Sequence, residues 1–202
     1  MAIIRLASPS DARGILDIYG PYVRDTSLTF ETETPSVEAF GERIAVYLHL
    51  CPWLVCEIDG RIAGYAYANK YRERVGYQWS VECSAYIHND FLAAHVGTAL
   101  YTALYTALFE ILKRQGFFNV YAVINLPNDR SVAFHERLGF EYFATYKNVG
   151  YKLGKWKNVG WWQLILNEYI DEPAPPVPFQ YMNKDFLPAL FNEVQQQIRI
   201  PS

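Results

Sequence analysis

The stretch AVINLPNDRSVAFHERLGF, residues 122–140, contains the clearest folding signals in the chain. Its apolar and β-branched beginning predicts a strand over residues 120–124. Asn128 predicts the start of a helix, since its side-chain oxygen can accept a hydrogen bond from a free amide of the first helical turn. Gly139 predicts the end of that helix, because glycine readily adopts the left-handed conformation that follows many helices. We therefore expect a strand, a short loop and a helix over residues 128–138.

A second strand-to-helix junction lies upstream of this stretch. Residues 77–87 predict a strand, and residues 97–115 predict a long helix that Gly116 ends. Gly97 stands where that helix begins. The free amides and positive dipole of a helix N-terminus suit a pyrophosphate, and a glycine lets the backbone approach it closely. Because single glycines are common at such positions, a simple tight turn is the alternative.

Short apolar runs and turn signals predict the remaining elements. Asp59-Gly60 stands between two apolar runs and predicts a hairpin. The other expected elements are strands 3–6, 53–58, 62–68, 142–149 and 159–166, and two helices that begin near residues 11 and 35, the second of which runs to residue 50. The order β-α-α-β-β-β-α-β-α-β-β predicts an α/β (α+β) fold in which helices flank a mixed sheet.

The composition excludes several classes of protein. The chain has 202 residues, of which 51% are hydrophobic and 16% aromatic, and this excludes an intrinsically disordered chain. Its net charge of −3 leaves no basic surplus for phosphates, so we expect no nucleic-acid partner. The three cysteines have no zinc or disulfide spacing, and the N-terminus has no signal-peptide pattern. We expect a cytoplasmic protein without a bound metal.

Residues 91–109 form a run without Asp, Glu, Lys or Arg that is long enough for a membrane-spanning helix. The run also contains a histidine, a glycine and threonines, and the rest of the chain has the pattern of a mixed α/β fold. We therefore expect a buried helix and no membrane partner.

The composition changes after residue 167. Residues 171–178 include four prolines, which is typical of an extended linker. Residues 185–198 have the amphipathic spacing of a short helix. We expect one domain over residues 1–166 and a proline-rich extension over residues 167–202.

These motifs and their order resemble the GNAT superfamily of acetyl-CoA-dependent N-acetyltransferases, and within it the phosphinothricin acetyltransferase-like branch. The resemblance extends over residues 3–166, and residues 122–140 are its most specific part. The other main matching stretches are Ile18-Tyr19, Thr29-Phe30-Glu31, residues 52–55, residues 59–68, residues 79–82 and residues 159–163.

The resemblance implies a strongly bent mixed sheet that is splayed between its fourth and fifth strands, with coenzyme A in the gap. It also implies transfer of an acetyl group from acetyl-CoA, a co-substrate, to the primary amine of a small amino-acid-like molecule such as phosphinothricin, methionine sulfone or an L-amino acid. A homodimer is implied too, since the last strand in this family often meets a partner subunit. Trp161 and Trp162 alternate along that strand, so we expect one of them to be exposed.

The chain departs from the family at the pyrophosphate motif, which is usually Gln/Arg-x-x-Gly-x-Gly/Ala. If Gly97 is the last glycine of the motif, Leu92 replaces the Gln/Arg and His95 replaces the first glycine. If Gly97 is instead the first glycine, Ala99 fills the last position and Ala94 replaces the Gln/Arg. Both alignments lack the basic or amide side chain. Backbone amides can still bind a pyrophosphate, so we expect weaker binding more than none.

The resemblance implies two catalytic residues, Glu82 and His135. An amine attacks a thioester only after it has lost a proton, which requires a general base. Glu82 matches the family's proposed catalytic glutamate, and its apolar strand would raise the pKa of the carboxyl group. Its alternative is a strand-edge carboxylate that faces solvent or pairs with Arg72 or Arg74. His135 stands where many GNAT enzymes have a tyrosine that protonates the departing thiolate, and its alternative is a helix histidine bonded to a carbonyl.

The resemblance also implies the ligand-binding residues. For acetyl-CoA they are Ala85, Tyr86, Ile87, His95, Val96, Gly97, Thr98, Ala99, Asn125, Asn128 and Ser131. For the acceptor they are Phe30, Glu31, Arg72, Arg74 and Tyr77. A guanidinium suits a carboxylate or a phosphinate. The alternative for Arg72 and Arg74 is a solvated charged loop, and Asn128 can equally serve only as a helix cap.

Two other kinds of function are compatible with the sequence. The missing side chain at the pyrophosphate motif fits a non-catalytic acyl-CoA-binding or sensing module. The aromatic surplus fits a structural oligomer without affinity for coenzyme A. Calorimetry with coenzyme A, combined with a turnover assay, distinguishes the three functions.

Overall fold

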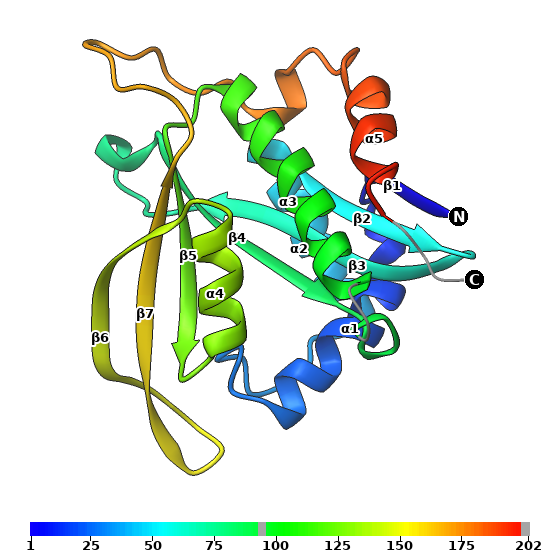
Figure 1. Cartoon of the computed structure of the whole chain (residues 1–202), viewed down its shortest axis with the longest axis vertical. Coiled ribbons are helices and arrows are strands. Elements are labelled where there is room, and N and C mark those ends of the chain that lie inside the picture. The colour runs from blue at the N-terminus through cyan, green and yellow to red at the C-terminus, as the bar shows by residue number, and fades with distance from the viewer. Residues whose placement is uncertain (93–95, 199–202) are drawn as a thin grey trace.

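The computed structural model describes residues 1–92 and 96–198, which form a seven-stranded sheet with helices on both faces (Figure 1). The strand order across the sheet is β1-β2-β3-β4-β5-β7-β6. The strands are β1 (Ala2–Leu6), β2 (Trp53–Ile58), β3 (Arg61–Lys70), β4 (Ser80–Ile87), β5 (Asn119–Leu126), β6 (Glu141–Lys152) and β7 (Lys155–Ile165). The helices are α1 (Ala12–Asp25), α2 (Val37–Leu50), α3 (Val96–Gln115), α4 (Asp129–Arg137) and α5 (Leu187–Gln195). The expected α/β architecture is confirmed.

The sheet is split between β4 and β5, the two neighbouring strands that run parallel. Their pairing covers only residues 80–83 of β4 and 119–122 of β5. Beyond this point, residues 84–87 stay paired with β3 and residues 123–126 stay paired with β7. The two strands therefore diverge and leave a V-shaped gap in the sheet (Figure 1). This is the splay that was expected between the fourth and fifth strands.

Helices α1 and α2 cover one face of the sheet, and α3 and α5 cover the other (Figure 1). An aromatic cluster fills the layer below α1 and α2, where the ring of Trp53 stacks on that of Tyr67 with centroids 4.2 Å apart. Aliphatic side chains of α3, among them Leu100, Leu104 and Leu108, fill the opposite layer. The sheet thus separates two hydrophobic cores.

Helix α3 contains most of the uncharged run of residues 91–109. Its apolar side chains pack against the sheet, so the expectation of a buried helix is confirmed. Nowhere in residues 1–92 and 96–198 is there a helix whose length and apolar character would allow it to cross a membrane.

Strands β6 and β7 are longer than expected at the hairpin tip, whereas α2 and β4 begin later than expected, each for a local reason. Helix α2 begins at Val37, later than expected, because the side chain of Ser36 accepts a hydrogen bond from the Ala39 amide at 3.1 Å and so caps the helix. Strand β4 begins at Ser80, since Val75–Tyr77 forms a short 3-10 turn instead of a strand.

The β6–β7 hairpin buries both tryptophans of the last strand, contrary to the expectation that one would be exposed. Trp161 and Trp162 are only 5% and 4% exposed. The ring of Tyr146 packs against Trp161 and the ring of Tyr142 packs against Trp162, each with centroids 5.3 Å apart. The exposed aromatic surface of the hairpin therefore belongs to β6 and to the hairpin tip.

The chain after β7 is tied to the core of the fold. The side-chain amide of Gln115, at the end of α3, donates to the Val177 carbonyl at 2.8 Å. Helix α5, within the stretch where a helix was expected, adds its apolar face to the core beside α3. The side chain of Gln195 accepts a hydrogen bond from the Ile4 amide at 3.3 Å. The tail thereby covers β1, which is an edge strand of the sheet.

Gly64 of β3 lies where the sheet packs closely against helix α3. A Cβ atom there would lie 2.3 Å from Ile87 Cδ1 and 3.5 Å from Leu104 Cδ1, and both of those side chains are fully buried. Gly64→Ala is expected to lower the free energy of unfolding, measured by urea denaturation, by about 1–3 kcal/mol. In Gly76→Ala, the control, the new Cβ would meet no atom of the described chain within 4 Å, so a change within about 0.5 kcal/mol is expected. Equal stability of the two variants would contradict this account.

Candidate active site

A cavity of about 270 Å³, here called the first cavity, lies in the gap between β4 and β5. It is bounded by the parted ends of the two strands, by the beginning of α3 and by α4. The predicted cofactor-binding residues in its lining are Ala85, Tyr86, Thr98, Asn125, Asn128 and Ser131. His135, predicted to be catalytic, also lines it. Asn128 caps α4 as well, because its side chain accepts a hydrogen bond from the Ser131 amide at 3.2 Å.

Some predicted cofactor-binding residues do not line the described part of the first cavity. Those that the structure describes are Ile87, Val96, Gly97 and Ala99. His95 lies outside the described residues.

Gly97 has a packing role that the sequence did not indicate. A Cβ atom at this position would lie 3.2 Å from both the Leu92 Cα atom and the Phe91 carbonyl oxygen. The space next to the glycine is thus occupied by the chain's own backbone. The glycine lets the turn before α3 pack closely on the helix.

The first cavity has positive charges and no negative ones in its described lining. Arg130 and Arg137 of α4 line it, and no carboxylate of the described chain does. Arg130 Nη2 donates to the Leu92 carbonyl at 3.3 Å, which places its guanidinium near the beginning of α3. The remaining lining is neutral or apolar. Such a cavity suits an anionic ligand that also has an uncharged part.

His135 is buried, and both of its ring nitrogens have partners. Nδ1 lies 2.8 Å from the Ser131 carbonyl oxygen, to which it donates, and Nε2 lies 3.4 Å from the Tyr105 hydroxyl. Burial lowers the pKa of the imidazole, and the hydrogen bond to Ser131 partly opposes this. The ring is therefore neutral at pH 7, with its proton on Nδ1 and with Nε2 as an acceptor. His135 is thus both a helix histidine bonded to a carbonyl oxygen and a residue of the first cavity.

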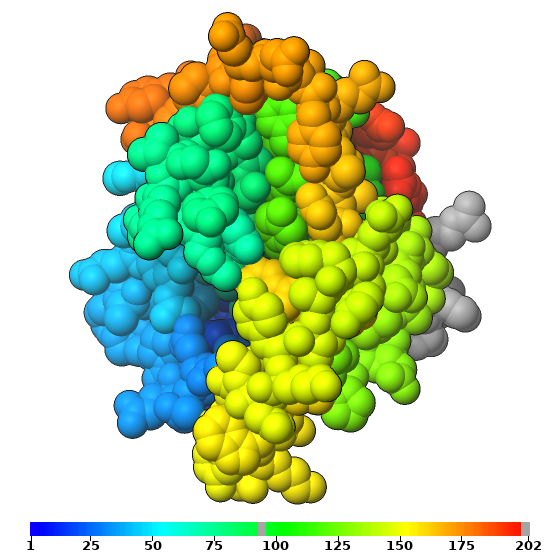
Figure 2. All heavy atoms as spheres, turned by 90° about the vertical axis from the view of Figure 1, so that its left-hand side faces the viewer, coloured from blue at the N-terminus to red at the C-terminus, as the bar shows by residue number. Residues whose placement is uncertain are grey.

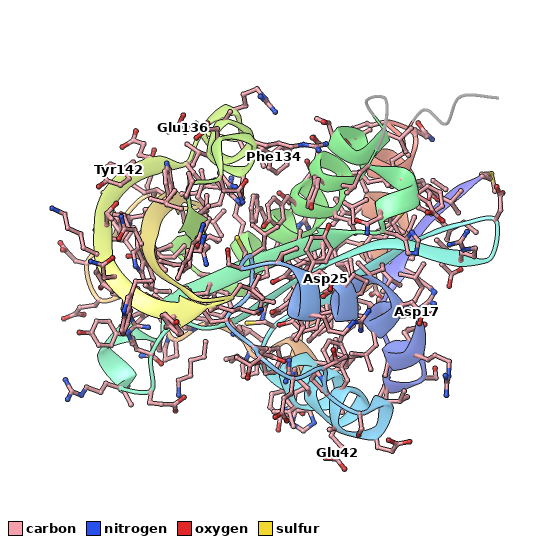
Figure 3. All side chains as sticks on the ribbon, turned by 90° about the horizontal axis from the view of Figure 1, so that it is seen from below. Asp17, Asp25, Glu42, Phe134, Glu136 and Tyr142 are labelled. Atoms are coloured by element: carbon pink, nitrogen blue, oxygen red, sulfur yellow. The ribbon has the colours of Figure 1, made fainter. Side chains whose placement is uncertain are left out.

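Tyr105 of α3 is a site residue that the sequence analysis missed. It lines the first cavity although it is almost completely buried. Figure 3 shows Phe134 pointing from α4 toward α3, and its ring packs 6.0 Å from that of Tyr105. Next to Tyr105, burial raises the pKa of Cys83 to about 12, so this thiol stays protonated. Tyr105 belongs to a regular apolar helix stripe, and nothing in that spacing distinguishes it from a core residue.

A second cavity, of about 410 Å³, adjoins the first. Its opening lies in the hollow that Figure 2 shows between the N-terminal helices and the β6–β7 hairpin. Five predicted site residues line it: Glu82, Phe30 and Glu31, and also Tyr86 and Asn125, which were predicted to bind the cofactor. The residues that line both cavities are Leu28, Ser84, Tyr86, Val123 and Asn125. Further residues of the second cavity that the sequence analysis missed are Tyr19, Arg43, Tyr47, Tyr67 and Asn69.

Glu82 stands at the base of the gap, where β4 and β5 are still paired. Burial raises the pKa of its carboxyl group, and the charge of Arg72 opposes that rise. Arg72 Nη1 lies 3.4 Å from Glu82 Oε1, and the guanidinium also lies over the rings of Tyr71 and Trp161. Glu82 thus pairs with Arg72 and faces the second cavity at the same time.

The other residues of the polar loop lie outside both cavities. Arg74 is exposed and precedes the turn Val75–Tyr77. Tyr77 is also exposed and packs edge-on against Tyr71 with ring centroids 5.8 Å apart. Like Arg72, these two residues do not line either cavity. The structure therefore does not bring Arg74 and Tyr77 together with Glu82 in the second cavity.

Residues 26–36, between α1 and α2, form a segment that covers the second cavity and is held by hydrogen bonds from the β5–β7–β6 arm of the sheet. Lys152 Nζ of β6 donates to the Thr29 carbonyl at 2.7 Å. The side-chain amide of Asn125, on β5, donates to the Ser27 carbonyl. Asn125, predicted to bind the cofactor, is therefore already bonded to this segment.

Arg43 of α2 provides a positive charge inside the second cavity. Its Nη1 forms an ion pair with Glu31 Oε1 at 2.7 Å, and its guanidinium lies 5.0 Å from the centroid of the Phe40 ring. The neighbouring Phe30 lies over Gly150 of β6, where a Cβ atom would come within 2.3 Å of the phenyl ring. The glycine makes room for this ring at the cavity wall.

Comparison with known proteins gives the same family from sequence. The family described as "Acetyltransferase (GNAT) domain" matches residues 4–161. A phosphinothricin N-acetyltransferase of Streptomyces viridochromogenes is 37% identical over 175 residues, which are 87% of this chain and 91% of that protein. The L-methionine sulfoximine/L-methionine sulfone acetyltransferase of Salmonella typhimurium is 32% identical over 82% of this chain and 95% of its own length.

Solved structures agree with the sequence comparison. A GNAT superfamily phosphinothricin acetyltransferase from Sinorhizobium meliloti, crystallised in complex with AcCoA, superposes with a TM-score of 0.76. The two chains are 28% identical, and the match covers 88% of this chain and 98% of the other.

The protonation state of His135 can be tested through stability. Because its pKa is lowered in the folded chain, the unfolded chain binds a proton more readily once the pH falls below the usual value of about 6.5. The folded chain should therefore lose stability as the pH falls from 6.5 toward 5, and His135→Gln should reduce this loss in urea denaturation. Nuclear magnetic resonance should place the imidazole pKa below 6.5 and the proton on Nδ1. A pKa above 6.5 would refute the assignment.

Proposed function

This chain belongs to the GNAT family of acetyltransferases, and on this basis we propose that it acetylates the primary amine of a small amino-acid-like molecule. As a family member it is an acetyl-CoA-dependent N-acetyltransferase. The observation that carries the proposed acceptor is the second cavity, which is polar and adjoins the first. The names of the relatives, which act on phosphinothricin and on methionine sulfoximine or sulfone, support an acceptor of this class.

The charge and the backbone edges of the first cavity suit acetyl-CoA. Its positive end, near Arg130 and the beginning of α3, suits the phosphates. Another part of the cavity is lined by residues 84–86 and 123–125, whose backbone edges have no strand partner across the gap. Unpaired peptide groups of this kind suit the amide-containing pantetheine arm. When bound, acetyl-CoA supplies the acetyl group as a thioester.

Glu82 is the proposed general base. The amine arrives as an ammonium ion and loses two protons as its nitrogen forms the amide bond and the bond between carbon and sulfur breaks. One proton goes to the sulfur and the other leaves to solvent. Glu82 accepts the proton of the ammonium directly or through one water. A carboxyl pKa raised by burial makes this residue a stronger base than an exposed glutamate.

His135 is proposed to help proton movement through Tyr105. Its Nδ1 proton is committed to the Ser131 carbonyl, so the nitrogen that faces the tyrosine is an acceptor. The imidazole therefore orients the Tyr105 hydroxyl at the wall of the first cavity. Of Tyr105 and His135, Tyr105 is the residue whose side chain carries a proton at the wall of the first cavity.

The acceptor is proposed to bind between the segment of residues 26–36 and β4. Glu31 and Arg43 provide opposite charges in the second cavity, which suit the ammonium and carboxylate of an amino acid. Phe30 provides an apolar wall. Arg72, which pairs with Glu82 outside the cavity lining, is proposed to bind an anionic group of the acceptor. Arg74 and Tyr77, which lie farther out, are proposed to meet the acceptor only as it enters.

We also propose a cytoplasmic homodimer. The β6–β7 hairpin exposes a group of aromatic side chains, Tyr142, Phe143, Tyr146, Tyr151 and Trp156. A patch of this kind on a monomer is typical of a protein–protein interface. The three cysteines are free thiols, which suits a reducing compartment.

Sedimentation velocity tests the dimer. The wild-type protein should sediment at twice the chain mass of 23.3 kDa, and Trp156→Glu, which places a charge in the aromatic patch, should sediment as a monomer. Tyr181→Glu is the control, because Tyr181 is exposed on the C-terminal tail, and it should remain dimeric. A monomeric wild-type protein would refute the proposed interface.

Substitution of Glu82 tests the general base. Glu82→Gln is expected to lower kcat by about 100-fold or more, while calorimetry with coenzyme A gives an unchanged affinity. In the wild type, activity should rise with pH through a pKa above 4.5, because the base acts only when deprotonated. This rise should be absent in the variant. Glu73→Gln removes an exposed carboxylate of the neighbouring loop and should retain activity.

The acceptor panel decides between the proposed enzyme and its main alternative. Phosphinothricin, methionine sulfone, methionine sulfoximine and the common L-amino acids are each supplied with acetyl-CoA. Turnover that Glu82→Gln abolishes supports the enzyme. Binding of coenzyme A without turnover of any acceptor supports a non-catalytic acyl-CoA-binding module instead.

A further inference from the structure

The loop before α3 lacks the basic or amide side chain that the resemblance leads one to expect, since Leu92 or Ala94 stands at that position. We propose that Arg130 of α4 supplies the missing contact and binds a phosphate group of coenzyme A in the first cavity. The proposal rests on the proposed function and deepens it by assigning a binding role to a residue outside the predicted set.

The position of Arg130 is the first argument. It lines the first cavity, and its Nη2 donates to the carbonyl of Leu92 at 3.3 Å. The guanidinium therefore lies beside the same loop that lacks a side chain of its own for phosphate. A guanidinium has five N–H donors, so this single contact leaves donors for a ligand.

The surroundings of Arg130 are the second argument. Tyr22 and Tyr101 line the same cavity. Burial raises the pKa of both phenols, and the positive charge of Arg130 acts on both in the opposite direction. The guanidinium is thus close enough to influence two hydroxyl groups of the cavity wall. Among the ion pairs of the described residues, none involves Arg130.

The charge of the two cavities is the third argument. The described lining of the first cavity contains two arginines and no carboxylate, whereas the second cavity contains Glu31 and Glu82 beside Arg43. Asp90, near the first cavity, is already paired with Arg61 at 3.1 Å. A ligand with several negative charges is therefore attracted to the first cavity, where Arg130 and Arg137 are the charged side chains of the described lining.

Arg130 is a better candidate than the other arginine of α4. Arg137 is seven residues further along the helix, which corresponds to about 10 Å of rise. Of these two arginines, Arg130 is bonded to Leu92 in the loop before α3, and among the described residues Arg137 has no hydrogen bond to that loop. The N-terminal end of α3 adds positive potential at the same place, so the phosphate contact is expected there.

Arg130→Gln tests the proposal, with Arg13→Gln as a control of equal charge change on the exposed surface of α1. Calorimetry with coenzyme A should show affinity about 10-fold or more weaker in Arg130→Gln and unchanged in Arg13→Gln. The KM for acetyl-CoA should rise by a similar factor while kcat stays within two-fold. Acetyl-pantetheine, which has no phosphate, should serve the variant and the wild type equally well. Arg130→Lys should recover part of the affinity.

Dephospho-CoA identifies the phosphate concerned. An equal loss of affinity for coenzyme A and dephospho-CoA in Arg130→Gln assigns the contact to the pyrophosphate, and a loss only with coenzyme A assigns it to the 3′-phosphate. Both results support the proposal. Unchanged affinity for coenzyme A, or an equal defect with acetyl-pantetheine, would overturn it while leaving the enzyme function intact. A wild-type protein that binds no coenzyme A would refute the proposed function itself.

Discussion

The parallel hydrogen bonding between β4 and β5 ends after the pairing of Cys83 with Ala122, and the active site follows from where it ends. Up to this point the two strands belong to one sheet. Beyond it, β4 continues with β3 and β5 continues with β7, so that each strand keeps one satisfied edge and turns the other toward the gap. Buried peptide groups without a partner are costly. The divergence therefore creates a space whose walls are already suited to a ligand with amide groups of its own.

The alternation of side chains along β4 distributes the chemistry over two cavities. Glu82, Ser84 and Tyr86 share one face of the strand and line the second cavity, where the acceptor is proposed to bind. Cys83 and Ala85 belong to the opposite face and line only the first cavity. Strand β4 thus carries the proposed general base on one face. On its other face it presents the small side chains of Cys83 and Ala85 to the proposed acetyl-CoA site. The reacting groups can meet only where both cavities share their lining, around Ser84 and Tyr86.

Most of the fold and part of the site were accessible from sequence, because they depend on local patterns. Residues 122–140 predict their own strand, cap and helix, and the alternation of apolar runs predicts the other elements. Arg43, Tyr105 and Arg130 were missed, since each enters the site through the approach of elements far apart in the chain. Periodicity shows that Tyr105 is buried, but it does not show that His135 of another helix lies beside it. Burial of both tryptophans of β7 was missed for the same reason, because β6 covers them.

The hydrogen bonds to the carbonyls of Ser27 and Thr29 have a consequence for how acceptor preference can change. Both donors, Asn125 and Lys152, belong to the arm of the sheet beyond the gap, whereas the segment that they hold begins and ends in helices of the other arm. The segment therefore connects the two arms of the sheet across the second cavity. The size of the space for the acceptor depends on the distance between these two arms. A larger acceptor is then expected to require a longer segment or different hydrogen-bond donors on β5 and β6, in addition to changes in the residues that line the second cavity.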